Sequence, residues 1–495
     1  MSDPRALIPE PGARLANLIG GEHSAEGADG WVERCSPHDG ALLWSFPDSG
    51  PEVVDRAVAV ARTAAQDWGW RTSAPHRGEI LHELAGLMAG HRDELATIIA
   101  AETGKAPGEA RGEVMGAVAL GRFFAGEGTR LFGRTMPSGV VGKRAMTVRE
   151  PVGVAGLIAA SNTPIANIAW KLFPALIAGN AAIVKAAEAT PATAQAFGML
   201  ATLAGVPDGV VAVIHGQRET GRRLVADPGV DLVSFTGSSE AGREIAEVCA
   251  RRMARVSLEL GGKNGFVVLD DADLDLAVDW AVRSAFSNAG QRCASGSRLI
   301  VTAGIHERFV EALLARTATL RVGPTDDDDL GPVITRAAAE RIVAAIEGAA
   351  ADGLPVLAGG HRLGGAEFEN GNYVAPTVVS MTEPDHALSG VELFGPVAQV
   401  YRVSDEHEAL ALLNDSPYGL TAAVHTRDLQ RAMRFVEAAS VGVVSVNGGT
   451  FGSEPHMPFG GRRWSGNGTR EPGTESLDVY TSLKTVYLWP EQELG

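Results

Sequence analysis

Short apolar runs alternate with helical segments through the middle of this chain, and this alternation constrains the fold more than any other feature. Runs at 152–160, 181–185, 210–215 and 232–235 are typical of buried strands, and the apolar spacing at 168–177 is that of a helix. Strands that alternate with helices pair in parallel and are covered by helices on both faces. The sequence therefore predicts an α/β fold with a mainly parallel sheet.

A second series of predicted strands begins near residue 257, at 265–269, 298–301, 397–403 and 441–446. The 495 residues are enough for two or three domains at about 100–200 residues each. Two successive α/β units account for this pattern.

The ends of the chain add helices and a further strand. Apolar residues at helical spacing predict helices over 52–68 and 79–102, and Gly104 is placed to end the second helix. Apolar and polar residues alternate over 477–489, which predicts a late strand. An edge strand near a chain end can pair with another subunit.

Charge and hydropathy exclude several kinds of partner. Lys and Arg total 43 against 60 Asp and Glu, a net charge of −17, which repels nucleic acid and anionic membrane surfaces. No apolar run is long enough to span a bilayer, and the first residues lack a signal-peptide pattern. Three cysteines are too few for a disulfide scaffold. We therefore expect a cytoplasmic protein with no nucleic-acid or membrane partner.

A run of four acidic residues at 326–329 precedes Leu330-Gly331-Pro332. A calcium-binding loop needs ligands spaced around a turn, with a glycine and a distal Glu, and that spacing is missing. Zinc-ligand spacing of His, Cys and Asp is missing as well. We interpret the run as a solvated loop and expect no metal site.

Three side chains are candidates for chemistry. Cys293 lies in a glycine-flanked segment, Glu259 lies between two leucines and before two glycines, and Asn162 follows a predicted strand. Each has a structural interpretation, as a small buried thiol, an ion-paired strand end and a turn residue. In the functional interpretation they are a nucleophile, a general base with a raised pKa and an amide donor to an oxyanion. The three residues alone leave both interpretations open.

Seven short motifs favour the functional interpretation. The motifs are Ser161-Asn-Thr-Pro164, Lys185-Ala-Ala-Glu-Ala-Thr-Pro191, Phe235-Thr-Gly-Ser-Ser-Glu-Ala-Gly242, Leu258-Glu-Leu-Gly-Gly-Lys263, Gly290-Gln-Arg-Cys293, Glu392-Leu-Phe-Gly-Pro396 and Pro458-Phe-Gly-Gly461. In their order they resemble the motifs of the aldehyde dehydrogenase superfamily, and the match extends over about residues 52–486. The segment at 465–481 looks most like the branch that includes α-ketoglutaric semialdehyde dehydrogenases.

The resemblance implies a covalent mechanism. Cys293 would attack the aldehyde carbon to form a thiohemiacetal, while Asn162 and the Cys293 backbone N–H stabilise the oxyanion. A hydride would then pass to a nicotinamide, and Glu259 would activate the water that hydrolyses the thioester. Lys171 and Glu471 match positions linked to proton relay, although a structural ion pair is an equal alternative.

The resemblance also implies an NAD site. Gly237 and Gly242 would let pyrophosphate approach the start of a helix, with Ser238 near the phosphates. Lys185 and Glu188 match residues that bind the adenosine ribose, and a carboxylate there would repel a 2′-phosphate. NAD is therefore the predicted cofactor, with NADP less favoured. The residues that match the nicotinamide end are Glu392 and Phe394.

The implied fold has three parts. A Rossmann-type NAD-binding domain would comprise residues 1–130 and 151–258, and an α/β catalytic domain would comprise 259–455. A hairpin at 131–150 and the C-terminal segment 478–495 would form a small β oligomerisation element. Because dimers and tetramers are usual in the family, we expect a homodimer or a homotetramer.

Substrate contacts are expected around the nucleophile. Ser161 is small where the family often has a bulky residue, and Thr163 is small as well, which would either widen the aldehyde tunnel or change its polarity. Arg292 either steers a carboxylate-bearing aldehyde or is a structural arginine. The remaining predicted contacts are Trp170, Ala294, Thr450, Phe451, His456 and Phe459.

Two other functions compete with simple aldehyde oxidation. A CoA-acylating dehydrogenase resolves the thioester with a thiol, but that branch typically lacks the water-activating Glu, and Glu259 is present. A non-catalytic relative is disfavoured because Asn162, Glu259, Cys293 and Glu392 are all retained. The sequence therefore predicts an NAD-dependent enzyme that oxidises a small-molecule aldehyde to a carboxylic acid.

Overall fold

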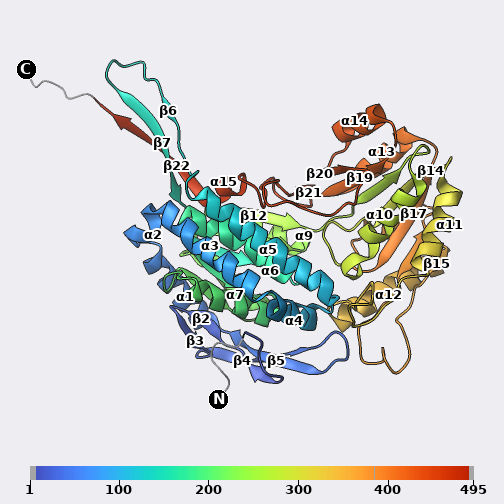
Figure 1. The fold of residues 1–495 in the computed structure, drawn as a ribbon, viewed down its shortest axis with the longest axis horizontal. Coiled ribbons are helices and arrows are strands. Elements are labelled where there is room, and N and C mark those ends of the chain that lie inside the picture. The colour runs from blue at the N-terminus through green and yellow to red at the C-terminus, as the bar shows by residue number, and fades with distance from the viewer. Residues whose placement is uncertain (1–6, 384, 490–495) are drawn as a thin grey trace, which may run out of the picture.

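The computed structural model describes residues 7–383 and 385–489, and two helix-covered sheets occupy most of it (Figure 1). Each of these sheets has seven strands, and most neighbouring strands are parallel. The predicted α/β class is therefore confirmed. The N-terminal half of the chain builds one sheet and the C-terminal half builds the other.

The first sheet consists, in spatial order, of β12 (Arg255–Leu260), β11 (Leu232–Gly237), β8 (Val154–Ile158), β9 (Ala181–Lys185), β10 (Val211–Ile214), β2 (Asn17–Ile19) and β3 (Glu22–Ser24). The chain adds β9 and β10 on one side of β8 and then crosses to add β11 and β12 on the other side. Sheets of this kind bind ligands beyond the carboxyl ends of the strands, where the strand order reverses. The gap beyond β8 and β11 is therefore the expected ligand site.

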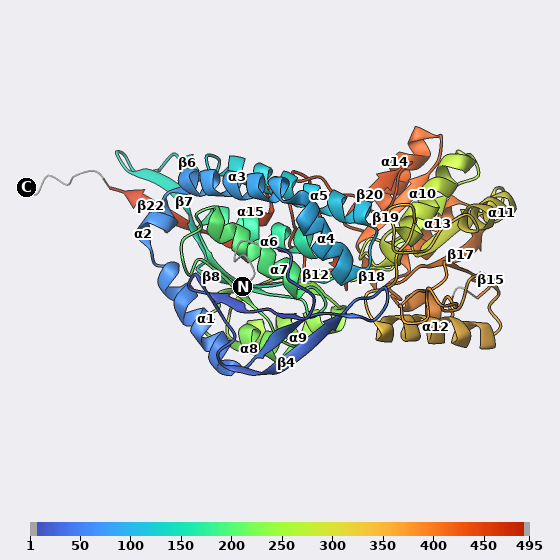
Figure 2. The ribbon, with the colours of Figure 1, turned by 60° about the horizontal axis from the view of Figure 1, so that its bottom comes forward.

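Helices cover both faces of this sheet (Figure 2). Alternate residues of each strand, such as Val154 and Ala155, face the two layers, so both faces are apolar and the strands read as continuous apolar runs. One layer consists of α1 (Pro51–Ala64), α8 (Arg218–Ala226) and α9 (Ser239–Arg251). The other consists of α2 (Trp68–Thr72), α3 (Ala74–Gly90), α4 (Arg92–Thr103), α5 (Pro107–Glu127), α6 (Pro164–Ala178) and α7 (Pro191–Leu203).

Two of the predicted helices have different limits in the structure. The helix predicted over 52–68 ends at Ala64. The helix predicted over 79–102 is two helices, α3 and α4, because His91 between them has φ −99° and ψ 24°, outside the helical range. Gly104 ends α4 with φ 76°, as predicted.

The second sheet consists, in spatial order, of β15 (Val356–Ala358), β16 (Thr377–Ser380), β17 (Val397–Val403), β14 (Arg298–Thr302), β13 (Gly265–Val268), β19 (Thr421–His425) and β20 (Val443–Val446). Strand β20 lies at an edge of this sheet, and its residues are partly exposed. The helices of this half are α10 (Leu274–Phe286), α11 (His306–Thr317), α12 (Arg336–Ala351), α13 (Glu406–Asn414) and α14 (Leu429–Ala438). Single 3₁₀ turns form η1 (Ser287–Gly290) and η2 (Ala387–Gly390).

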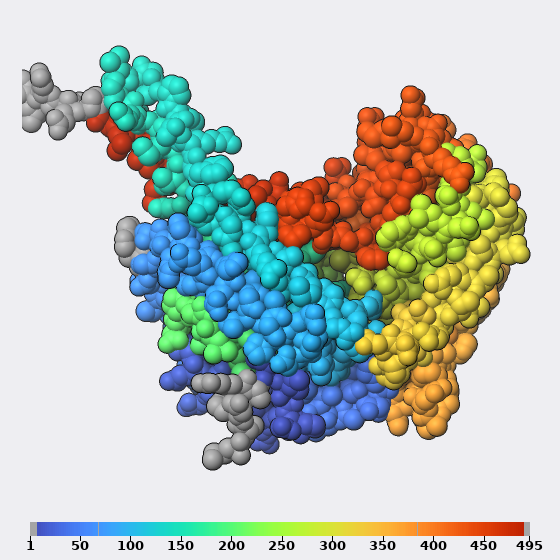
Figure 3. Space-filling view, viewed as in Figure 1, coloured from blue at the N-terminus to red at the C-terminus, as the bar shows by residue number. Residues whose placement is uncertain are grey.

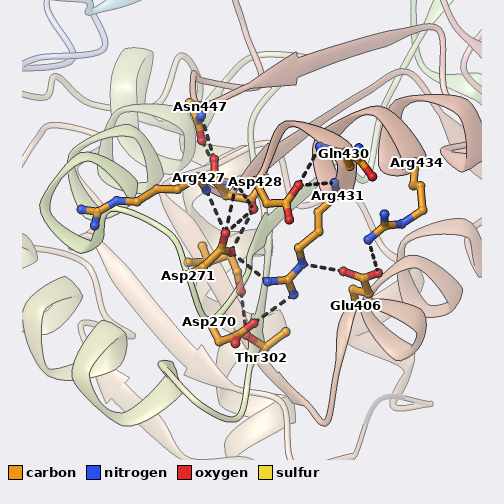
Figure 4. Close-up of polar contacts among 12 residues, drawn as sticks. Asp270, Asp271, Thr302, Glu406, Arg427, Asp428, Gln430, Arg431, Arg434 and Asn447 are labelled. Atoms are coloured by element: carbon orange, nitrogen blue, oxygen red, sulfur yellow. Dashed lines mark hydrogen bonds and ion pairs between the residues drawn. The ribbon is translucent and has the colours of Figure 1, made fainter.

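Ion pairs fill the space beyond the carboxyl end of β13 (Figure 4). The guanidinium of Arg431, on α14, contacts Asp270 and Asp271 at 2.9 Å each and also contacts Glu406 at the start of α13. Asp271 also accepts a hydrogen bond from the Thr426 hydroxyl, directly after β19. These ion pairs connect α13 and α14 to the sheet and occupy the space at the end of β13.

A three-stranded antiparallel arm projects from the molecule, and the surface is hollowed between the arm and the second half (Figure 3). It consists of β22 (Thr481–Leu488) at one edge, β7 (Arg144–Pro151) in the middle and β6 (Thr135–Met136). The strand predicted over 477–489 begins only at Thr481, because the preceding residues form the short helix α15 (Ser476–Tyr480), which buries Tyr480. A short apolar–polar alternation does not distinguish one helical turn from a strand.

Smaller sheets complete the fold, namely β1 (Ala13–Arg14) with β5 (Leu42–Ser49) and β4 (Ala28–Cys35), and β18 (Tyr418–Gly419) with β21 (Arg462–Arg463). The domain limits stay a prediction, and residues 1–6 and 490–495 of the predicted parts lie outside the described residues. Among the helices of the described residues, none is both long and apolar enough to cross a membrane.

Candidate active site

The loop that carries Cys293 is strained and firmly held. Directly before it, Asn288 and Ala289 have φ of 53° and 51°, a left-handed conformation that costs a residue with a Cβ about 1–2 kcal/mol. Gly290 continues this turn with φ 68°, and a Cβ there would lie 2.0 Å from the Gly395 carbonyl oxygen. The Asn264 amide donates to the Cys293 carbonyl at 2.7 Å. The fold thus fixes where the thiol lies.

Asn162 reaches the same place from the first sheet, between β8 and α6. Its side-chain amide donates one hydrogen bond to the Gln291 carbonyl at 2.8 Å, which leaves its second N–H hydrogen for another acceptor. Its backbone carbonyl accepts from Lys105 Nζ at 2.8 Å and from the Asn288 amide at 3.1 Å. Asn162 and Cys293 both line one cavity of about 520 Å³. The structure therefore brings these two predicted residues together.

This cavity, called the tunnel below, contains most of the predicted substrate contacts. Of the nine, the six that line it are Thr163, Trp170, Arg292, Ala294, Phe451 and Phe459. Thr450 is buried in the protein but does not line the tunnel, and its hydroxyl donates to the Ala294 carbonyl at 2.6 Å. Ser161 and His456 are not in the lining either, and the His456 side chain is 57% exposed.

One wall of the tunnel was not predicted. It is formed by α5 and by Lys105, two residues before the helix begins, and its residues on α5 include Glu109, Gly112, Glu113 and Gly116. A Cβ at either glycine would meet no atom within 4 Å, so the small residues leave open space along the helix. The sequence signal that could have indicated this wall is the spacing of the two glycines, because residues four apart lie on the same face of a helix.

Glu259, on β12, is a buried carboxylate that has no hydrogen-bond partner for either oxygen among the described residues. Burial raises its pKa well above the usual 4.5, and the nearby Glu471 carboxylate raises it further, against the opposing charges of Lys171 and Arg470. A carboxylate whose pKa is raised in this way is a stronger base than an exposed glutamate.

Lys171 and Glu471 form an ion pair with an Nζ–Oε2 distance of 2.8 Å. The Ser234 hydroxyl accepts from Lys171 at 3.0 Å and donates to Glu471 at 2.6 Å, which closes the group. The structural ion pair is therefore present, whereas the proton-relay role stays a prediction.

The Cys293 thiol is in an environment that disfavours the thiolate. Burial raises its pKa to about 12, and the negative charges of Glu392 and Glu259 contribute to the increase. The thiol therefore needs a base to remove its proton during attack.

A second cavity, of about 920 Å³, lies beyond the carboxyl ends of β8, β9 and β11. Lys185, Glu188 and Ser238 line it, as predicted for cofactor contacts, and burial lowers the pKa of Lys185. Ser238 is the N-cap of α9 and accepts from the Ala241 N–H. A Cβ at Gly242 would lie 2.5 Å from Leu260 Cδ2, so this glycine allows α9 to pack closely on the sheet, while Gly237 ends β11.

Glu392 and Phe394 lie outside the second cavity, beside the Cys293 loop. Glu392 accepts from the Gly262 N–H at 3.0 Å, and burial raises its pKa to about 7. A Cβ at Gly261 would lie 2.0 Å from a Glu392 oxygen, so the missing side chain at this position leaves the space that the carboxylate occupies. Phe394 has φ 54°.

Comparisons with known proteins agree with this geometry. The family model described as "Aldehyde dehydrogenase family" matches residues 24–486. The chain is 41% identical to the alpha-ketoglutarate semialdehyde dehydrogenase of Haloferax volcanii, over 88% of this chain and 90% of the relative. It is 38% identical to the succinate-semialdehyde dehydrogenase [NADP(+)] of Escherichia coli, over 95% and 97%. The crystal structure of Staphylococcus aureus betaine aldehyde dehydrogenase in complex with NAD+ superposes with a TM-score of 0.95 at 31% identity, covering 98% of this chain and 97% of that one.

Proposed function

The chain belongs to the aldehyde dehydrogenase family, and on that premise we propose that it oxidises an aldehyde to the carboxylic acid with NAD as the hydride acceptor. The observation that carries the proposal is that Cys293 and Asn162, which come from different halves of the chain, line one tunnel. The Glu259 carboxylate, which has no hydrogen-bond partner among the described residues, would supply the base that the hydrolytic step needs.

In the first half of the reaction the Cys293 sulfur bonds to the aldehyde carbon while its proton passes to a base. Glu259 is the candidate base, because its charge acts on the Cys293 thiol and no other group occupies its oxygens among the described residues. The carbonyl oxygen becomes negative, and the second N–H of the Asn162 amide and the backbone N–H of Cys293 would stabilise it. NAD, when bound, accepts the hydride that leaves the tetrahedral carbon, and the carbon becomes a thioester.

In the second half Glu259 takes a proton from water, and the resulting hydroxide bonds to the thioester carbon. The C–S bond then breaks, the acid leaves, and the sulfur takes up the proton that Glu259 removed from water. Glu259 would serve both halves by releasing the thiol proton to solvent before the second half begins, and burial, which holds its pKa well above that of an exposed glutamate, makes it a competent base in each. The presence of this base favours hydrolysis over transfer of the acyl group to CoA.

The second cavity fits a dinucleotide. It offers about 920 Å³ beside the first turn of α9, and the buried ammonium of Lys185 lies 3.9 Å from Glu188. A carboxylate at Glu188 suits free ribose hydroxyls and opposes a 2′-phosphate. We therefore propose NAD as the preferred cofactor and NADP as a weaker one, although the E. coli relative is named for NADP(+).

The substrate we propose is a semialdehyde, an aldehyde that also carries a carboxylate. The two relatives compared above by sequence are named for such substrates. In this chain the Arg292 guanidinium lines the tunnel next to Cys293, where it can contact a carboxylate at the far end of a short substrate.

The nucleophile is tested with the Cys293→Ala variant. We expect no NADH formation from any aldehyde, while NAD still binds as measured by quenching of protein fluorescence. Turnover that persists in this variant would contradict the role of Cys293. Formation of acyl-CoA from aldehyde, NAD and CoA by the wild-type protein would favour the CoA-acylating alternative.

We also propose that the chain forms homodimers or homotetramers in the cytoplasm. Support for assembly comes from the unpaired outer edge of β22 and from exposed apolar side chains on that strand, with Leu483 64% and Tyr487 55% exposed. The three cysteines are free, which fits a reducing compartment. Light scattering on the Leu483→Asp variant tests the interface: we expect a smaller species than the wild type, and an unchanged mass would contradict it.

A further inference from the structure

Arg292 is not a free cation in the tunnel. Its Nη2 lies 3.3 Å from Glu109 Oε1, and its guanidinium carbon lies 4.9 Å from the centre of the Phe451 ring. The Nε atom is buried and has no hydrogen-bond partner among the described residues. The guanidinium is therefore held from two sides, and its buried Nε–H is left without an acceptor among the described residues.

Glu109 holds this arginine from the first turn of α5. Its Oε1 atom also accepts a hydrogen bond at 3.0 Å from the backbone N–H of Asn288, the first residue of the left-handed turn before Cys293. Its Oε2 atom is buried without a partner among the described residues. One carboxylate thus contacts both the arginine beside the nucleophile and the loop that carries the nucleophile.

The other charges of the tunnel are also paired or distant from Arg292. Lys105 pairs with Glu113, and both side chains are buried, at 3% and 6% exposure. Glu454 is 74% exposed at the mouth and lies 3.7 Å from His456. Among the described lining residues, both the lysine and the arginine are therefore neutralised by a glutamate on α5.

We propose that Glu109 is a specificity-determining residue, which limits the attraction of Arg292 for aldehydes that carry a carboxylate. A substrate carboxylate that approaches Arg292 is attracted by the guanidinium charge. It is also repelled by the Glu109 carboxylate, which is paired with that guanidinium. The selectivity between acidic and neutral aldehydes is set by the difference between these two effects. This inference rests on the proposed aldehyde oxidation and adds to it the residue that tunes the substrate class.

The Glu109→Gln variant separates charge from position. The glutamine carbonyl oxygen can still accept from the Asn288 N–H and from Arg292, so the loop and the guanidinium keep their hydrogen bonds. Only the negative charge is removed. We compare 4-oxobutanoate with 4-methylpentanal, a neutral aldehyde with the same branching. The ratio of kcat/KM for the acidic aldehyde to that for the neutral one should increase about fivefold, as expected for one opposing charge at a partly solvated site.

Two comparisons show whether the effect acts through Arg292. In the Arg292→Gln background, Glu109→Gln should change the ratio by less than about twofold, because the cation that Glu109 neutralises is gone. The Glu454→Gln variant is the matched control, since it removes one charge at the tunnel mouth without contacting Arg292. The inference is wrong if the ratio is unchanged in Glu109→Gln, if Glu454→Gln raises it equally, or if the effect persists without Arg292.

A binding measurement keeps this test independent of turnover. Calorimetry with succinate, the product-like dicarboxylate, should give about fivefold tighter binding to Glu109→Gln than to the wild-type protein. If the wild type fails to oxidise either aldehyde but succinate binding tightens, the proposed function fails while the inference on Glu109 stands. Equal or undetectable succinate binding in both proteins overturns the inference. Matching thermal unfolding midpoints would exclude misfolding as the cause.

Discussion

Lys171 and Glu471 are 300 residues apart in the sequence and form an ion pair whose side chains are only 1% and 0% exposed. The pair connects α6, which begins just after Asn162, to the segment that precedes α15. Both charges act on the pKa of Glu259, one in each direction. The C-terminal segment is thereby tied to the residues predicted to carry the chemistry.

Breaking this pair should destabilise the protein strongly. In Lys171→Met the Glu471 carboxylate stays buried without its cation, and we expect a loss of about 3–5 kcal/mol, seen as a lower urea midpoint. The double variant Lys171→Met/Glu471→Gln should recover part of this loss, because no uncompensated charge remains. An unchanged midpoint in the single variant would show that the pair contributes nothing to stability.

Loss of the Glu259 carboxylate should separate the two halves of the reaction. In Glu259→Gln we expect a rapid burst of about one NADH per site in a stopped-flow experiment, followed by turnover at least 100-fold slower than wild type, because water is no longer activated. A missing burst would mean that Glu259 is also required before hydride transfer, as the base for Cys293.

The pH dependence of turnover should follow the ionisation of Glu259. Its pKa is raised, so the carboxyl is protonated and inactive as a base at low pH, and turnover rises as pH increases through that pKa. Arg470 opposes the increase in pKa, so Arg470→Gln should move the rising limb of the kcat profile to higher pH. A limb that stays in place or moves to lower pH would contradict this assignment.

Removal of the predicted oxyanion donor should slow the chemistry without loosening the fold. Asn162→Ala removes one side-chain donor, and we expect kcat to fall about 10²–10³-fold. The Lys105 and Asn288 contacts to the Asn162 backbone carbonyl are retained, so the unfolding midpoint should change little. A fall in kcat of less than about threefold would argue against an oxyanion role.

The Arg431 cluster should be a stability element whose contribution depends on pH. Arg431→Met leaves Asp270 and Asp271 without their cation and leaves Glu406 with Arg434 alone, and we expect a loss of about 2–3 kcal/mol at neutral pH. Arg431 holds the pKa values of Asp270 and Glu406 below their usual values, so its contribution exists above about pH 4 and disappears as pH falls and these groups protonate. Urea midpoints measured at neutral and acidic pH test this.

The matched control is Arg434→Met, because among the described residues the Arg434 guanidinium forms an ion pair with Glu406 alone, and its side chain is 58% exposed. We expect it to cost less than about 1 kcal/mol. Equal losses in both variants would contradict the special role of Arg431.

The sequence predicted the central strands closely, because strands buried on both faces are continuous apolar runs. The strands at 181–185 and 397–403 have the predicted limits. The break at His91 and the helix α15 were not predicted, since a kinked helix keeps its apolar spacing and a single turn mimics a strand.

The site was predictable where short motifs mark it and not where distant segments meet. Asn162 and Cys293 were singled out from local sequence, and the structure places both in the tunnel. Glu109 was not, because its partners Asn288 and Arg292 lie on a loop about 180 residues further along the chain. Contacts between residues so far apart in the sequence do not affect the spacing of apolar residues within either segment, so that spacing cannot reveal them.

The tunnel and the larger cavity beside α9 share no lining residue. If the tunnel admits the aldehyde and the larger cavity binds the adenosine half of NAD, as we propose, substitutions along the α5 wall would alter which aldehydes enter without changing the residues that bind the dinucleotide. Substrate preference could thus change through substitutions in the tunnel alone, while the residues of the second cavity remain unaltered.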